Sequence, residues 1–171
     1  MQQAKIYLSI SKAVADYAHR LTRFNANFNV SPPIGGWSYS EVYSHIFDSS
    51  LLSLMAIQNC IKGEAKMVNS AWGAKAVLFF GMLPPGKKYK VPERLAKRVK
   101  KIQIQEAQQL ILNFEQQLAA VLHDISSSNP KIRVAHPRLG PLNAIEWLRF
   151  TEVHLYHHLK QLSRIEKSLV K

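Results

Sequence analysis

The stretch NAIEWLRFTEVHLYHHLKQLSRIEK, residues 143–167, decides the fold. Its apolar residues recur three or four positions apart, which is the spacing of one face of an α-helix. Asn143 and Glu146 stand three apart at its start, as in a capping box, and Leu142 and Trp147 can form the accompanying hydrophobic staple. The pattern predicts a long helix that ends at about Lys167. Its expected core residues are Leu148, Leu155, Leu159, Leu162 and Ile165.

Three further segments show the same helical periodicity. The first runs from about Ala4 to Phe24, and the third spans about residues 102–126. The second begins with a capping box of Ser38 and Glu41, and we expect it to end at about Ile61, before Gly63. Their expected core residues are Ile6, Ile10, Val14, Tyr17 and Leu21 in the first helix and Ile104, Ile111, Phe114, Leu118 and Leu122 in the third. No strand pattern competes with these helices, and SSSNPKIRVAHPRLGPL, residues 126–142, is expected to be a polar connection.

Residues 63–101 form a long connection between the second and third helices. A connection of this length allows the two helices to run parallel, whereas a short loop would make them antiparallel neighbours. It contains a short apolar piece, AWGAKAVLFFGML, which ends at residue 83. The chain of 171 residues suffices for one domain with a single core. The sequence therefore predicts an all-α four-helix bundle, residues 1–171, with a long crossover between helices two and three.

Composition and cysteine content exclude several classes of protein. Hydrophobic residues make up 47% of the chain and charged residues 20%, a globular balance that argues against disorder. No apolar stretch has the length of a signal peptide or of a membrane span, so we expect a cytoplasmic protein that is not embedded in a membrane. Cys60 is the only cysteine, which excludes an internal disulfide, a CxxC redox pair and a cysteine-based zinc site. Any metal is therefore expected to be held by nitrogen and oxygen.

The net charge of +12 is concentrated in one segment. KKYKVPERLAKRVKK, residues 87–101, has eight Lys or Arg against one Glu. Such a run attracts nucleic acid, an anionic membrane surface or acidic small molecules. It contains a single aromatic residue, Tyr89, and no known nucleic-acid motif, which favours a solvated connection over nucleic-acid binding.

Histidines in two predicted helices form a candidate metal site. His154 and His158 are four apart and lie on one helical face, where two imidazoles can bind one ion, whereas His157 points about 100° away. His45, two turns into the capped second helix, is the best candidate for a third ligand. The spacing alone leaves an alternative open at each position, namely a hydrogen-bonded core or surface histidine. Cys60 is about 22 Å along the helix from His45, too far to ligate the same ion.

Three sequence features resemble the DinB superfamily, the YfiT-like metal-dependent hydrolases. WSYSEVYSHIFDSS, residues 37–50, places a histidine shortly after a tryptophan, and HPRLGPLNAIEWLRFTEVHLYHHLKQLSRI, residues 136–165, has the HP..G.L...EW approach and the H..HHL.Q run. PPGKKYKVPE, residues 84–93, resembles the crossover of a branch of uncharacterised function. The resemblance spans essentially the whole chain. It implies an up-down-down-up four-helix bundle and a three-histidine site for zinc, nickel or a similar divalent ion, with His45, His154 and His158 as ligands.

A three-histidine site leaves at least one coordination position open, which is typical of catalytic rather than structural sites. A histidine that binds a metal through one ring nitrogen usually donates the N–H of its other ring nitrogen to an oxygen acceptor. Asp48, Glu152 and Gln161 lie within helical reach for this role, and His136 can border the pocket. Each has an alternative: Asp48 can pair with a basic side chain, Glu152 can be a solvated face residue, Gln161 can cover the helix end, and His136 can be exposed. No clear general base is present.

The resemblance implies one of two activities on a small molecule: metal-dependent hydrolysis, or transfer to a low-molecular-weight thiol. The alternative, from a different class, is a metal- or ligand-binding stress-response protein without catalysis. The three histidines suit zinc, nickel, copper and iron, and neither the substrate nor the general base can be named. A homodimer formed through exposed helix faces is a further expectation.

Overall fold

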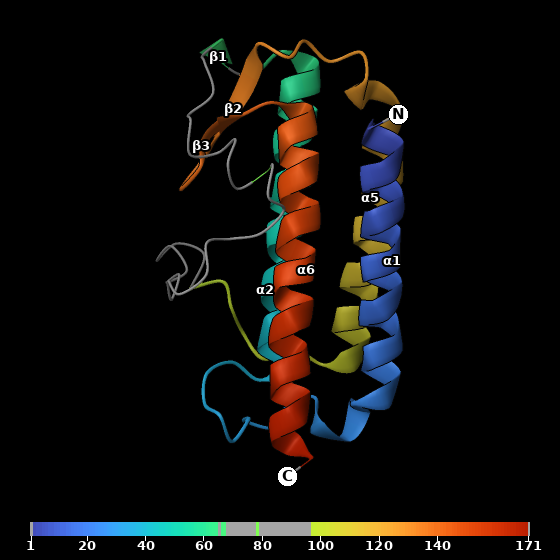
Figure 1. Ribbon diagram of the computed structural model, residues 1–171, viewed down its shortest axis with the longest axis vertical. Coiled ribbons are helices and arrows are strands. Elements are labelled where there is room, and N and C mark those ends of the chain that lie inside the picture. Colours follow the sequence, from blue (N-terminus) through green and yellow to red (C-terminus); the bar gives the residue numbers. More distant parts are fainter. Residues whose placement is uncertain (1, 65, 68–77, 79–96, 171) are drawn as a thin grey trace.

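The computed structural model describes residues 2–64, 66–67, 78 and 97–170. Four long helices lie side by side: α1 (Gln2–Arg23), α2 (Tyr39–Lys62), α5 (Ile104–Ile125) and α6 (Ala144–Leu169). A short 3-10 helix, η1 (Asn25–Asn27), follows α1. α1 and α6 run in one direction and α2 and α5 in the other, as the colours of Figure 1 show. The predicted all-α bundle with up-down-down-up order is confirmed.

The helix boundaries follow from the capping chemistry in the sequence. Ser38 and Asn143 form complete capping boxes with Glu41 and Glu146, in which each side chain bonds to the other residue's backbone N–H. Gly63 ends α2 with φ 75°, a left-handed conformation that glycine adopts without steric cost. All four predicted helices are present, with ends within two residues of the expected positions.

The core lies between the four helices. α2 packs against α6 and α5, α1 packs against α6, and the contact between α1 and α5 closes the bundle. Every core residue expected in α1 and in α6 is buried. In α5, Ile111, Phe114 and Leu118 are buried, whereas Ile104 and Leu122 pack against the core while partly exposed.

Buried tyrosines fix the positions of α1, α2 and α6. The Tyr17 hydroxyl donates to the Leu155 carbonyl at 2.8 Å, and the Tyr43 hydroxyl donates to the Tyr17 carbonyl at 2.7 Å. Burial raises the pKa of both tyrosines well above the usual value, so both hydroxyls stay protonated donors. Because Leu155 directly follows His154, these bonds hold the middle of α6 against α1 and α2.

The connection before α6 contains strands that the sequence analysis did not predict. β2 (Ile132–His136) pairs antiparallel with β3 (Gly140–Leu142) and with β1 (Lys66–Met67), giving the order β1-β2-β3. The expectation of an irregular polar connection was therefore wrong. These strands are too short to show a reliable period-2 pattern, and contacts with helices stabilise them. β2 packs against α2, β3 packs against α6, and the Trp147 indole N–H of α6 donates to the Val134 carbonyl at 3.3 Å.

The crossover falls largely outside the described residues. This applies to the predicted apolar piece, residues 71–83, apart from Leu78, and to residues 87–96 of the basic run. Among the described residues, no helix combines the length and hydropathy needed to span a membrane.

Candidate metal centre

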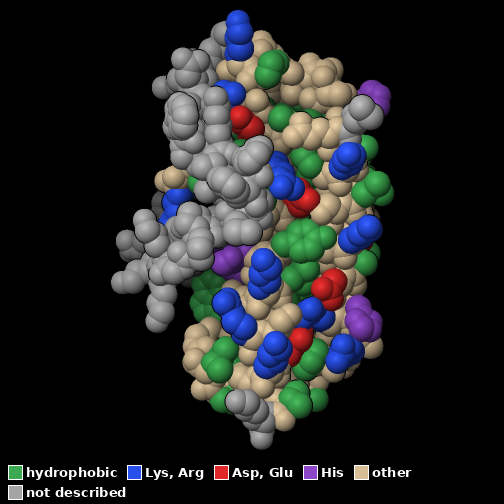
Figure 2. All heavy atoms as spheres, in the orientation of Figure 1, with side chains coloured by type: hydrophobic (Ala, Val, Ile, Leu, Met, Phe, Trp, Pro, Cys, Tyr) green, Lys and Arg blue, Asp and Glu red, His purple; other side chains and the backbone are tan. Residues whose placement is uncertain are grey.

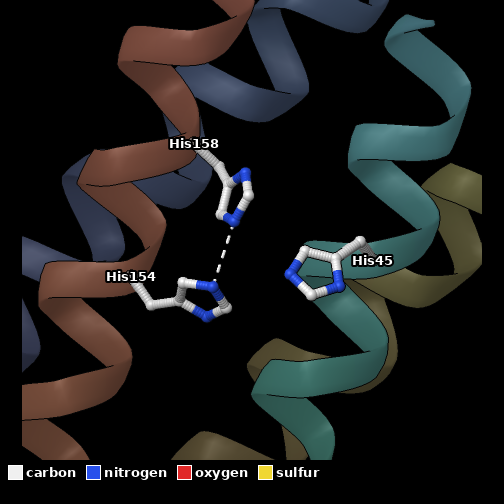
Figure 3. A group of neighbouring side chains, drawn as sticks. All are labelled: His45, His154 and His158. Carbon is white, nitrogen blue, oxygen red and sulfur yellow. Dashed lines mark hydrogen bonds between the residues drawn. The ribbon is translucent and has the colours of Figure 1, made fainter. Parts of the chain in front are cut away.

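Three histidine side chains converge between α2 and α6. His45 comes from the second turn of α2, and His154 and His158 come from successive turns of α6 (Figure 3). The ring centroid of His45 lies 5.3 Å from that of His154 and 4.9 Å from that of His158. The centroids of the two α6 rings are 4.7 Å apart. The structure thus brings together the three side chains that the sequence analysis named.

The three rings share a weakly solvated environment. His45 and His158 are buried, and His154 is partly buried. Burial lowers the pKa of His45 to about 4, although the carboxylate of Asp48 acts in the opposite direction. Burial, followed by the mutual repulsion of the histidines, also lowers the pKa of His154 and of His158. All three imidazoles are therefore neutral at pH 7, the state in which a ring nitrogen can bind a metal.

Hydrogen bonds orient the two α6 rings. His158 Nδ1 lies 2.8 Å from Oε1 of Gln161, an oxygen that can only accept, so the ring hydrogen is on Nδ1 and Nε2 has a free lone pair. His154 Nδ1 lies 3.4 Å from the Ser49 hydroxyl. Among the described residues, none forms a hydrogen bond with His45.

The nitrogens of the two α6 histidines are spaced as ligands of one ion, and a His45 nitrogen lies near both. One ligand atom from each histidine lies within 4.8 Å of the other two, and the Nε2 atoms of His154 and His158 are 3.0 Å apart. Two metal–nitrogen bonds of about 2.1 Å that meet at about 90 to 110° place the nitrogens about 3.0 to 3.4 Å apart. The donor set, three neutral nitrogens without thiolate or carboxylate, suits a divalent transition metal.

The comparison with protein families agrees with this geometry. The model of the DinB superfamily matches residues 10–162, which include α2, α5, most of α1 and α6, and the three histidines. The chain belongs to the DinB superfamily. No curated protein and no solved structure matches the chain at a significant level.

Aromatic rings line the site of this DinB-superfamily chain on two sides. Trp37, directly before α2, has its ring centroid 4.9 Å from that of His45 and 6.3 Å from that of His158. Phe150 of α6 stacks on His154 at 5.2 Å. The sequence analysis assigned Trp37 only to a helix staple and did not consider Phe150 for the site. Phe150 precedes His154 by four positions, a spacing that indicates a shared helical face.

Two carboxylates proposed to contact the histidines bond to arginines instead. Asp48 accepts two hydrogen bonds from Arg98, at 2.7 and 2.5 Å. Glu152 forms an ion pair with Arg149, one turn earlier on α6, and lines a different cavity, next to α1. Glu152 is two positions from His154, about 200° around the helix, so its carboxylate cannot reach the other side of α6.

The other residues considered for the DinB-type site lie around or away from it. His136 in β2 packs on Phe150 with ring centroids 4.4 Å apart. Because Phe150 in turn stacks on His154, His136 borders the site indirectly, through the Phe150 ring. His157 is not part of the three-histidine group, and its ring lies perpendicular to that of His158 with the centroids 5.1 Å apart. Cys60 is buried at the other end of α2, where its thiol donates to the Leu142 carbonyl.

Three of the described basic residues of this run contact other parts of the chain. Arg98 pairs with Asp48, Lys100 pairs with Glu106, and Lys101 donates to the Asn29 carbonyl. On the face shown in Figure 2, Lys and Arg side chains are spread out with carboxylates between them.

Proposed function

We propose that this chain is a metal-dependent enzyme in which His45, His154 and His158 hold one divalent ion, zinc or nickel. The observation that carries the proposal is the convergence of three neutral imidazoles from α2 and α6 on one point. Within the described residues, this group gains no Cys, Asp or Glu as a fourth ligand, so coordination positions remain for a reactant.

The proposed reaction is hydrolysis of a small molecule or transfer to a low-molecular-weight thiol. When bound, the ion supplies Lewis acidity, which activates a water or thiol nucleophile and polarises the group that it attacks. The residues of the chain hold and shape this centre. Gln161 orients His158 through Nδ1, while Trp37 and Phe150 cover the outer faces of the ligand rings and restrict the access of water.

A second candidate function is a binding protein without catalysis. The supporting observation concerns the general base: the carboxylates of Asp48 and Glu152 are both committed to arginines. Among the described residues, neither of these candidates is therefore free to take a proton from a nucleophile.

Metal analysis and a turnover screen test the proposal. We expect purified wild-type protein to contain about one zinc or nickel per chain, and His154→Ala to contain almost none, because two imidazoles bind much more weakly than three. His123→Ala is the matched control, since His123 is exposed and bonds only to the neighbouring Asp124. Esters, amides and thiol acceptors are then assayed with metal and after chelation.

The outcomes separate the candidates. Product formation that disappears on chelation and returns with metal supports the enzyme. Stoichiometric metal without turnover across the panel supports the binding protein. A wild-type chain that neither contains nor takes up zinc or nickel contradicts both.

A further inference from the structure

His154 has a contact that links the two helices of the metal centre. Its Nδ1 lies 3.4 Å from the Oγ of Ser49, a buried residue one turn after His45 on α2. The helix that supplies one histidine therefore also contacts a histidine of the other helix. The carboxylates that the sequence placed near the site do not make such a contact, because arginines bind them.

The direction of this hydrogen bond follows from the second contact of Ser49. The Ser49 hydroxyl lies 3.1 Å from the Ile46 carbonyl, which can only accept, so the single hydroxyl hydrogen points to Ile46. The Ser49 oxygen is then an acceptor toward His154, and the hydrogen of the neutral ring lies on Nδ1. In this tautomer the lone pair of His154 Nε2, the atom that lies 3.0 Å from Nε2 of His158, is available to an ion.

We propose that Ser49 is a positioning residue of the metal centre: by accepting the Nδ1–H of His154, it directs the unprotonated Nε2 of that ring toward the ion. This inference rests on the proposed function. Gln161 does the same for His158, so each α6 histidine has its own acceptor. Without an ion, the two Nε2 atoms lie at hydrogen-bond distance, 3.0 Å, and one of them carries a hydrogen; a cation bound to both displaces that hydrogen, which Ser49 accepts when it moves to Nδ1 of His154.

Removal of the Ser49 oxygen weakens metal binding without removing a ligand. The Nδ1–H of His154 then lacks its acceptor, and the competing tautomer, with hydrogen on Nε2, cannot bind the ion. Loss of such an outer partner typically lowers metal affinity about 10- to 100-fold. Alanine favours helices more than serine does, so Ser49→Ala is expected to fold.

The chain offers a closely matched control. Ser53 lies one turn further along α2, is also buried, and donates to the Ser49 carbonyl at 2.9 Å, but it forms no hydrogen bond with a histidine among the described residues. Ser53→Ala therefore removes a buried helical hydroxyl without altering the site. Ser49→Thr retains an oxygen that can bond to both the helix carbonyl and His154, so it tests rescue.

The test is zinc affinity, measured by competition with a chromophoric chelator. We expect Ser49→Ala to bind zinc about 10- to 100-fold more weakly than the wild type, and Ser53→Ala and Ser49→Thr to remain close to it. In zinc-loaded protein labelled with [15N]histidine, the Nδ1–H signal of His154 is expected to be protected from exchange in the wild type and lost by exchange in Ser49→Ala. The Nδ1–H of His158, bonded to Gln161, serves as the internal reference.

The two possible failures are distinguishable. If the wild type binds zinc and Ser49→Ala binds it equally well, the role of Ser49 is overturned and the proposed metal centre stands. If the wild type does not bind zinc, the proposed function fails and this inference fails with it. A purely structural role for Ser49 would lower stability but leave the His154 signal protected, which also overturns the inference.

Discussion

Individual histidines in this chain differ in role because their Nδ1 atoms have different hydrogen-bond partners. His123 is exposed and pairs with Asp124. His136 uses Nδ1 to accept the backbone N–H groups of Arg138 and Leu139, at 3.2 and 3.0 Å, and so shapes the turn between β2 and β3. His154 and His158 donate from Nδ1 to side-chain oxygens, which leaves Nε2 available for an ion.

His136 makes stability depend on pH. Burial, with a smaller contribution from Arg138, lowers its pKa from 6.5 to about 4. Between these values the unfolded chain binds a proton that the folded chain does not, so stability is complete above pH 6.5 and is lost as pH falls toward 4. In His136→Asn, the side-chain oxygen can accept the same two N–H groups but does not titrate.

We expect His136→Asn to reduce the pH dependence of the free energy of unfolding by up to one proton, or about 1.4 kcal/mol per pH unit. Urea unfolding at several pH values in this window measures the slope. The buried histidines of the metal centre contribute to the slope in both proteins, so the difference reports His136. Equal slopes in the two proteins would contradict the assignment.

Sequence patterns predicted the residues of the site better than their partners. The spacing of His154 and His158 follows from the helix, and Gln161 is three positions from His158, so both relationships are local. Asp48 pairs with Arg98, fifty positions away, and no local pattern indicates that contact. The link between Ser49 and His154 was missed for the same reason, although Ser49 lies one turn from His45 and shares its helical face.

Helices proved more predictable than strands. The starts of α2 and α6 are encoded within four residues by capping boxes, and Gly63 marks the end of α2. β2 and β3 were missed because they are stabilised by tertiary contacts, of β2 with α2 and of β3 with α6, which a local sequence pattern does not show.

The Asn143 cap is expected to stabilise the helix that carries two of the histidines. Its Oδ1 accepts the Glu146 N–H at 3.0 Å, and its Nδ2 donates to the Pro130 carbonyl at 3.3 Å. We expect Asn143→Ala to lower the free energy of unfolding by about 1 to 2 kcal/mol, and Asn143→Ser, which retains a cap oxygen, to lose less. Chemical denaturation measures both. Zinc affinity is expected to stay constant, and equal stability of Asn143→Ala and wild type would contradict the role of the cap.

The whole bundle depends on which helices are neighbours. Apolar stripes showed that each helix buries one face, and the long crossover allowed α2 and α5 to run parallel. A stripe does not identify the helix that it packs against, so only the family resemblance placed His45 beside His154. The observed packing of α2 on α6 joins the two ligand-bearing helices directly.

An ion at this junction is expected to stabilise the whole fold. Zinc at about 100 times its dissociation constant adds about 2.7 kcal/mol to the free energy of unfolding, because it binds the folded chain preferentially. For a chain of this size, that raises Tm by about 5 to 10 °C. His154→Ala is expected to show almost no rise. Thermal unfolding with and without zinc measures the effect, and an equal rise in the variant would place the bound zinc elsewhere.

The distance between the ligands along the chain has a kinetic consequence. His45 and His154 are separated by 109 positions (154 − 45), and they meet only after α2 and α6 have docked. Before docking, only His154 and His158 of α6 are close enough together to bind an ion, and two imidazoles bind it weakly. We therefore expect zinc to slow unfolding while leaving the refolding rate almost unchanged.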